Sequence, residues 1–565
     1  MSGRTRRELI RGAASTLVLG GAIARSAPAR ANPADRPPGR QTLDFRPFEP
    51  DRARMTETMR CRLDGFVLEA TAPQLQSDLN VGRYSSAELV AFYIDRIETL
   101  DVDRFRSVIE LNPDALTLAV EFDSERAQGR QRGPLHGLPV LLKANIGTGD
   151  RLHTTAGAVA LADATSDRDA HLVAALRNAG AIILGKSNLS EWAFWMAYYA
   201  PNGFSALGGQ VFSPYGESID PFGSSTGSAV AATMNLAAMT VGTETMGSII
   251  SPAARASVVG MRPTLGLVSR DRVLPLSDEC DTPGPIARTV TDVAALLTAM
   301  TAERDMSDRK SGRAAGMHGT DFMAALDPEA LRGKRIGLIG VEFAEPAADD
   351  WIIANSGLVD AARALEIAGA RVVVLRPGPF DLIEPGVTPA FNWGMREGVN
   401  AYLAATGAPI GSLANIVDFN YLDPQTYAPW GQERLHDCLM CPLSETEVRQ
   451  LSRANRRQAR EYLLALFNDE ELDALAGIDS AQSRIYPIAG FPAIAVPAGL
   501  NPWGTPFALT FIARAQADAD LIAMAYAFEQ ASRFRVPPPL VSKCRPARPT
   551  TGVGGVRWPI GLAPS

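Results

Sequence analysis

The sequence predicts an α/β protein, a single large domain in which a central mixed β-sheet is covered by helices on both faces. Two observations support this fold class. Short apolar runs alternate with amphipathic helical patterns along most of the chain, which is typical of a sheet packed between helices. The 565 residues are 46% hydrophobic and 21% charged, the composition of an ordinary globular protein with a large core. Length alone is compatible with one domain or two.

The N-terminus predicts an export signal of the twin-arginine type over residues 1–31. Arg6 and Arg7 precede a short apolar run, and the small-residue site Ala29-Arg30-Ala31 follows it. We expect cleavage after Ala31 and a soluble periplasmic or secreted protein. The run is too short to span a bilayer, and no later apolar window is long enough, so no stable membrane insertion is expected. A leader over 32–60, a catalytic domain over 61–545 and a tail over 546–565 complete the predicted organisation.

The first half of the domain begins with a helix and continues with alternating strands and helices. Ser85 to Glu88 form a capping box before a helix over 89–100. Apolar runs at 138–143 and 181–186 predict strands, and the helical pattern at 168–180 lies between them. The segments 334–340, 365–370 and 370–377 repeat the order strand, helix, strand.

The second half adds a helical stretch and two further strands. Residues 392–467 are expected to be mainly helical, most clearly over 445–467. The segments 490–500 and 507–514 return to strand character. The pattern at 518–532 predicts a final helix.

The charge balance and the cysteines exclude several classes of function. A net charge of -7 leaves no basic face for nucleic acid, so a small neutral or cationic substrate is expected. Five cysteines imply no disulfide framework. Cys438 and Cys441 form a C-x-x-C pair, but no second pair accompanies it, which favours incidental cysteines or one local disulfide over a metal or redox site.

One candidate for the catalytic nucleophile is Ser225, since Gly223 to Gly227 match the G-x-S-x-G elbow of α/β-hydrolases. His318 and His436 follow in the required chain order. However, the elbow needs a strand immediately before it, and the preceding residues read as a loop rich in proline and glycine.

A longer ordered set of motifs points to a different site. The stretches "GPLHGLPVLLKANI", "DPFGSSTGSAVAATMN", "TVGTETMGSIISPAARAS" and "GFPAIAVPAG" together resemble the amidase signature family, and "VIELNPDAL", "LGKSNLSEWA" and "DTPGPIART" are similar to bacterial peptide amidases. The resemblance implies the fold of that family. It also implies Ser248 as the nucleophile, Ser224 as a serine that follows a cis peptide bond, and Lys143 as the terminal base.

No histidine lies within sixty residues of Ser248 on either side. A neutral lysine can replace one as the base, because burial among apolar neighbours disfavours the ammonium form. The resemblance further implies an oxyanion hole formed by the backbone N–H groups of Thr245, Met246, Gly247 and Ser248.

Three residues depart from the family pattern, and they concern the pocket more than the triad. Ala144 replaces a common acidic residue, Met246 a usual glycine, and Ile250 a common arginine. The segment 478–489 is also shorter than the usual loop beside the substrate. Substrate specificity is therefore not carried over from peptide amidases.

An aromatic cluster follows the strand at 181–186: Trp192, Phe194, Trp195, Tyr198 and Tyr199. It predicts either core packing, which we favour, or a wall for an apolar acyl or aryl group. No phosphate-binding loop, dinucleotide fingerprint or metal motif is present, so no cofactor and no metal are expected.

These features predict an exported serine hydrolase that cleaves an amide of a small molecule or peptide, with water as the second substrate. The same triad suits an ester or carbamate. Two rivals are a catalytically silent binding protein and a cytoplasmic amidotransferase subunit, and the predicted signal argues against the latter. A monomer and a homodimer are both compatible with the sequence.

Overall fold

The computed structural model describes residues 42–340, 348–375, 387–539, 541–542 and 544. The predicted signal, part of the leader, the tail and the end of the predicted strand at 370–377 lie outside these residues. All of these described residues belong to one compact unit. Within the described ranges, no helix is long and apolar enough to cross a membrane.

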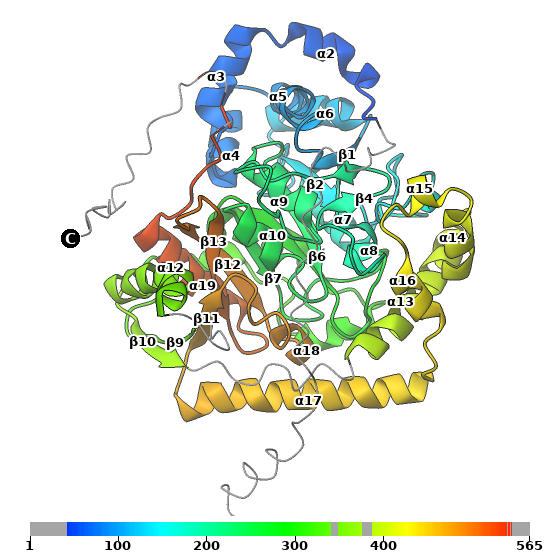
Figure 1. Cartoon of the computed structure of the whole chain (residues 1–565). Helices are drawn as coiled ribbons and strands as arrows, with labels where there is room; N and C mark the ends of the chain where they lie inside the picture. Colours follow the sequence, from blue (N-terminus) through cyan, green and yellow to red (C-terminus); the bar gives the residue numbers. More distant parts are fainter. Residues whose placement is uncertain (1–41, 341–347, 376–386, 540, 543, 545–565) are drawn as a thin grey trace, which may run out of the picture. The chain divides into compact units, whose positions relative to one another are not determined.

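An 11-stranded mixed sheet forms the centre of the described chain (Figure 1). In spatial order its strands are β1 (Val108–Leu111), β3 (Ile182–Ser187), β2 (Pro139–Lys143), β6 (Met239–Glu244), β8 (Thr282–Ala287), β7 (Val259–Arg262), β12 (Ala493–Leu500), β13 (Pro506–Ile512), β11 (Ala474–Ile478), β9 (Arg335–Ile339) and β10 (Arg371–Leu375). The pairs of β2 with β3 and β6, and of β9 with β10 and β11, are parallel. The remaining pairs are antiparallel, so the prediction of a mixed sheet is confirmed.

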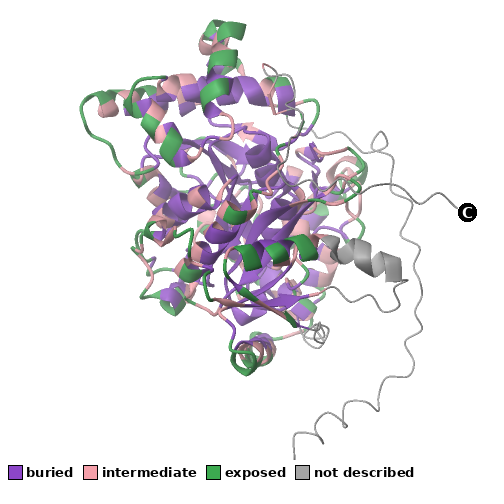
Figure 2. Ribbon diagram, turned by 90° about the vertical axis from the view of Figure 1, so that its left-hand side faces the viewer, coloured by how far each residue is buried: buried purple, intermediate pink, exposed green. Residues whose placement is uncertain are grey.

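Helices cover both faces of this sheet, and the strands between them are buried (Figure 2). On one face, α9 (Thr226–Thr233) and α10 (Ile250–Arg255) pack on each other and on the central strands. On the other face, α11 (Val290–Met300), α12 (Ala348–Ile367) and α19 (Asp518–Ser532) form a second layer. The predicted single α/β domain is therefore confirmed.

The remaining helices extend the two ends of this core. They are α2 (Glu49–Arg54), α3 (Glu57–Val67), α4 (Ala72–Asn80), α5 (Ser86–Arg96), α6 (Ala115–Ala127), α7 (His171–Asn178), α8 (Glu191–Phe194), α13 (Val387–Thr406), α14 (Leu413–Asn420), α15 (Pro424–Tyr427), α16 (Glu433–Leu439), α17 (Glu445–Asp469) and α18 (Tyr486–Ala489). The capping box at Ser85 and Glu88 is present, and α5 passes at Arg96 into a π-helical turn over Ile97–Asp101, so the predicted helix over 89–100 is confirmed. The helical stretch 392–467 is confirmed as α13 to α17.

One disulfide, between Cys61 and Cys544, joins α3 to the segment after α19. The alternative of a local disulfide at Cys438 and Cys441 is wrong, because both thiols are free and buried. Spacing along the chain favours local pairing, whereas the fold brings together two cysteines that are 483 residues apart.

Candidate active site

Lys143 is the last residue of β2, and its side chain is completely buried. Its Nζ donates to three oxygens: Ser224 Oγ at 2.7 Å, Ser225 Oγ at 3.0 Å and the Thr243 carbonyl at 3.3 Å. Two of these partners come from the loop before α9 and one from β6. Lys143 is thus held where the carboxyl ends of two parallel strands meet, a common place for functional groups in α/β sheets.

Burial lowers the pKa of Lys143 to about 7, even though the nearby Asp281 and Glu244 favour its charged form. A large fraction of the side chain is therefore neutral near neutral pH. A neutral amine in this position donates its N–H groups to Ser225 and Thr243 and presents its lone pair to the Ser224 hydroxyl. This is the state that proton abstraction requires.

Ser224 and Ser225 lie next to each other but have different partners. The peptide bond between Gly223 and Ser224 is cis, and both serine side chains are fully buried. Ser225 Oγ donates to the Thr243 carbonyl at 3.0 Å and accepts from the Thr243 N–H at 3.1 Å. A Cβ at position 242 would lie 2.7 Å from Ser225 Oγ, so only glycine permits this close approach. The proton of Ser225 is thus already donated to a carbonyl, which argues against the elbow hypothesis.

Ser248 is the only one of these three serines with exposed surface, at 9%. Its carbonyl accepts a hydrogen bond from the Ser225 N–H at 3.1 Å, which joins its loop to the one that carries Ser224. No hydrogen bond joins the hydroxyls of Ser224 and Ser248 within the described ranges. Contacts of this kind are often long without substrate and shorten when the reacting complex forms.

Ser248 and the residues just before it form a set of unpaired backbone donors. The N–H groups of Met246, Gly247 and Ser248 donate to no acceptor in the described part of the chain. Gly247 has a φ of +80°, and a Cβ there would also meet Ser251 and Ser483 at 3.0 Å. Glycine is needed at this position, and the free N–H groups have the chemistry of an oxyanion hole.

Glu244 holds this loop from one side, a role that the sequence did not suggest. Its Oε2 accepts the N–H groups of Ile249 and Ile250 at the start of α10, at 2.8 and 3.1 Å. Its Oε1 accepts from the Tyr486 hydroxyl at 3.1 Å and lies 3.7 Å from the buried Arg262 guanidinium. The carboxylate thereby stabilises the helix N-terminus directly after Ser248.

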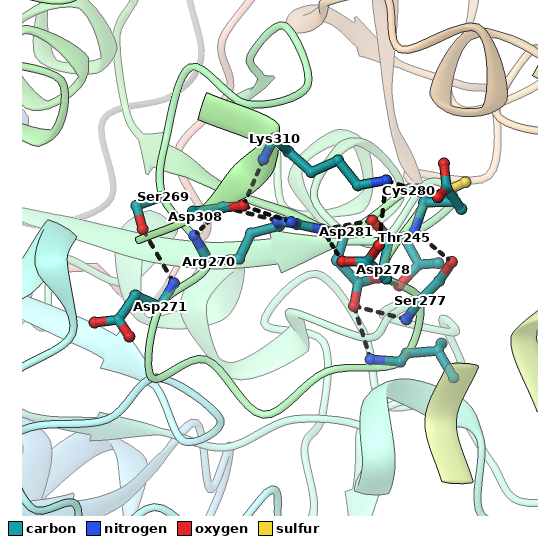
Figure 3. Close-up of polar contacts among 12 residues, drawn as sticks. Thr245, Ser269, Arg270, Asp271, Ser277, Asp278, Cys280, Asp281, Asp308 and Lys310 are labelled. Carbon is teal, nitrogen blue, oxygen red and sulfur yellow. Dashed lines mark hydrogen bonds and ion pairs between the residues drawn. The ribbon is translucent and has the colours of Figure 1, made fainter. Parts of the chain in front are cut away.

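Asp281 also holds this loop, and Figure 3 shows its contact with Thr245. Its carboxylate accepts from Thr245 Oγ1 at 2.5 Å and from the N–H groups of Leu276 and Ser277 at 2.7 Å each. Burial raises the pKa of Asp281 despite these bonds. In the sequence, neither Glu244 nor Asp281 differs from any other acidic residue, because the partners of each are brought close only by folding.

The three residues that depart from the family pattern occupy apolar surroundings. Ala144 and Ile250 are buried, and the half-buried Met246 packs against a cluster that includes Phe391 and Ile488. The Met246 side chain thus lies between the backbone donors and an apolar wall, where it can contact a substrate.

The predicted aromatic cluster divides between core and surface. Trp192 is buried, whereas Tyr198 and Tyr199 are 49% and 66% exposed. Trp195 is half-buried, donates from Nε1 to Asn392 at 2.9 Å and packs against the same apolar cluster as Met246. Of the five aromatics, Trp195 is therefore the one that the packing associates with the loop Thr245–Ser248, the candidate oxyanion loop.

The other candidate groups lie apart from Ser248. His436 pairs with the Tyr421 hydroxyl, Cys438 contacts Asn392, and the His318 Nδ1 is buried and has no hydrogen-bond partner among the described residues. Among the described residues, no group of His, Cys, Asp and Glu has the arrangement of a metal site.

Comparison with known proteins identifies the family and the fold. Residues 88–477 match the family model described as Amidase. A probable amidase of Arabidopsis thaliana is 36% identical over 488 residues, which cover 84% of this chain and 92% of the relative. The peptide amidase from Stenotrophomonas maltophilia is 39% identical, covers 83% of this chain and 98% of its own, and superposes with a TM-score of 0.79. An amidase family protein from Bacillus anthracis, at 32% identity, covers 89% and 100% with a TM-score of 0.83.

The match spans the strands and loops that carry Lys143, Ser224 and Ser248, and the relatives share the fold over most of their length. The chain therefore belongs to the amidase signature family of hydrolases that act on amide bonds.

Proposed function

We propose that this chain hydrolyses amides through an acyl-enzyme formed on Ser248. The observation that carries the proposal is the contrast in burial around Lys143. Lys143, Ser224 and Ser225 are fully buried, and Ser248 alone has exposed surface. A substrate from solvent reaches only this hydroxyl. The base, Lys143, is shielded from water, and burial lowers its pKa to about 7.

In the proposed acylation, Lys143 takes a proton from Ser224 Oγ, which in turn takes the proton of Ser248 Oγ. Ser248 Oγ then bonds to the carbonyl carbon of the amide. The carbonyl oxygen becomes an oxyanion, which accepts hydrogen bonds from the N–H groups of the loop Thr245–Ser248. The carbon–nitrogen bond breaks as the nitrogen receives the proton from Lys143 through Ser224, and ammonia or an amine leaves.

Deacylation uses the same groups in the same order. A water molecule loses a proton through Ser224 to Lys143 and bonds to the acyl carbon. The bond to Ser248 Oγ then breaks, Ser248 recovers its proton, and a carboxylic acid is released. The cycle consumes the amide and one water molecule and regenerates the chain.

Labelling with a fluorophosphonate probe followed by peptide mapping tests the nucleophile. We expect the label on Ser248 and no label in a Ser248→Ala variant of normal thermal stability. A label on Ser225 would restore the elbow hypothesis. If neither this probe nor the smaller phenylmethylsulfonyl fluoride labels the wild type, a binding protein without catalysis becomes the better explanation.

We also propose that the protein is exported. The motivation is the pair Arg6 and Arg7 with the cleavage site at Ala29 to Ala31. The disulfide between Cys61 and Cys544 supports the proposal, because such bonds persist in oxidising compartments.

Fusing residues 1–35 to a reporter that folds in the cytoplasm tests export. The reporter should appear outside the cytoplasm, and replacing both arginines by lysine should retain it inside. Export that survives this replacement would indicate the general secretory route instead.

A further inference from the structure

A cleft of about 750 Å³ lies between the segment 270–281, the 3₁₀ turn η5 (Arg309–Ala314), α13 and α17. The proposed chemistry uses none of the arginines that line it. The cleft is large enough for a small ligand, and both polar and apolar side chains face it.

The cleft adjoins the oxyanion loop. Asp281 lines it and accepts the hydrogen bond of the Thr245 hydroxyl, as Figure 3 shows. Phe391 and Ile488 also line it, and both belong to the apolar cluster against which Met246 packs. Asp281 and this apolar cluster therefore border both the cleft and the loop Thr245–Ser248.

The acidic groups at the centre of the cleft are already neutralised. Asp278 pairs with Arg270 and Lys310, and Glu279 pairs with Lys310 and Arg456. Burial opposes the ionisation of Glu279, but Arg456 and Lys310 hold its pKa below the ordinary value. Cations of the cleft itself thus already pair with these two carboxylates.

Three arginines of the lining have no such partner: Arg309 and Arg313 on η5, and Arg453 on α17. None of them pairs with a carboxylate in the described ranges. Arg453 is three residues before Arg456, so the two share one face of α17. Desolvation and then the nearby Arg456 lower the pKa of Arg313. These guanidinium groups therefore keep donors available for an anion.

We propose that Arg313 and Arg453 bind a carboxylate that the amide substrate carries at a distance from the scissile bond. The inference rests on the proposed hydrolysis at Ser248 and names a class of substrate for it. Guanidinium groups suit this role because their planar donors match a carboxylate. The preference is for an anionic substrate, which the net negative charge of the chain did not suggest.

Matched pairs of substrates test the proposal. Glutaryl p-nitroanilide and valeryl p-nitroanilide have acyl chains of equal length and differ by one carboxylate. A second pair, the valeryl amides of p-aminobenzoate and p-toluidine, places the carboxylate on the leaving group. In at least one of the two pairs, we expect the KM of the carboxylate substrate to be about fivefold to tenfold below that of its neutral partner. This range corresponds to two exposed ion pairs.

Arg313→Gln and Arg453→Gln together should remove this difference and leave kcat/KM for the neutral substrates unchanged. Arg449→Gln is the matched control, since Arg449 lines the same cleft from α17 but pairs with Glu445. If Arg449→Gln reduced the KM difference as much, the preference would come from the total charge of the cleft rather than from a binding site. That result would overturn the proposal. Equal KM values within both wild-type pairs, or a difference that survives the double substitution, would overturn it as well.

Calorimetric binding of the same pairs to a Ser248→Ala variant separates this inference from the proposed hydrolysis. Preferential binding of a carboxylate compound there supports the arginine site even if the wild type releases no amine. Equal binding of both members of each pair contradicts the site, whatever the wild type hydrolyses.

Discussion

At the scale of single residues, Lys143 carries the most specific prediction. Lys143→Ala should lower the acylation rate about 10²-fold to 10⁴-fold, as expected for the loss of a general base. Lys143→Arg should be no better, because a guanidinium keeps its proton at any workable pH. Pre-steady-state kinetics with a chromogenic amide measure both effects.

The pH profile gives a second measurement of the same role. Burial places the pKa of Lys143 at about 7, so the neutral base is scarce below that pH and predominates above it. The wild-type rate should therefore rise with pH through about 7 and level off, and this limb should vanish in Lys143→Ala. Near-normal turnover of Lys143→Arg would refute the role, since position 143 would then need only a positive charge.

Met246 should act on specificity rather than on chemistry. Its side chain packs against the apolar cluster next to the backbone donors. Met246→Gly should keep activity on small amides and change the preference among bulky ones, which a panel of acyl anilides of increasing size measures. One common factor for all substrates would mean that only the rigidity of the loop had changed.

The sequence predicted the site residues that lie in recognisable motifs. It did not predict the residues that only folding brings to the site. Lys143 and Ser224 were expected together, and the structure places Nζ 2.7 Å from Oγ. Glu244, Asp281 and Tyr486 were not expected at the site. The Tyr486 hydroxyl meets Glu244 across 242 residues, a contact that no local spacing predicts.

At the scale of elements, the start of α10 depends on Glu244. Glu244→Gln should lower the free energy of unfolding by about 1–3 kcal/mol, because an amide accepts fewer bonds and leaves buried donors unpaired. Thermal or denaturant unfolding measures the loss. The surface change Glu445→Gln is a suitable control, since that pair with Arg449 is more than half exposed and should matter by less than about 0.5 kcal/mol.

The strand β8 was not predicted from the sequence, and its prolines are the physical reason. Pro283 and Pro285 argue against a central strand, because proline has no N–H for the ladder. In the structure they stand opposite Thr243 and Val241. The backbone groups of Thr243 bond to Lys143 and Ser225, away from β8, so this pair exchanges no ladder bonds. On the other side, pairing with β7 stops at Gly260 and Ile286, before either proline.

At the scale of the whole molecule, the sequence predicted the fold class and the final helix over 518–532, because period and length agree there. It did not predict the order of the strands. That order brings β12 and β13 between β7 and β11, and it depends on contacts between distant parts of the chain. The link from Cys61 to Cys544 was unpredictable for the same reason.

This disulfide should stabilise the described unit measurably. The segment after α19 also binds the N-terminal helices through Arg535 with Glu69 and Ser542 with Asp64. Cys544→Ser should cost about 2–4 kcal/mol and lower the Tm by a few degrees. Dithiothreitol should lower the Tm of the wild type and leave that of the variant unchanged. An equal effect of the reductant on both would show that the bond contributes nothing.

The strand β6 runs past the last residue with which β2 pairs, since Leu142 faces Val241 and Thr243 lies two residues further on. The partners that Lys143 and Ser225 find there are main-chain atoms of Thr243. Every amino acid supplies the same carbonyl. A saturation mutagenesis scan at position 243 will therefore measure which side-chain sizes and polarities are tolerated, but not the contribution of this main-chain contact. Replacing the amide that joins Gly242 to Thr243 by an ester, through chemical ligation, deletes the N–H that Ser225 accepts and makes the contribution of the backbone visible.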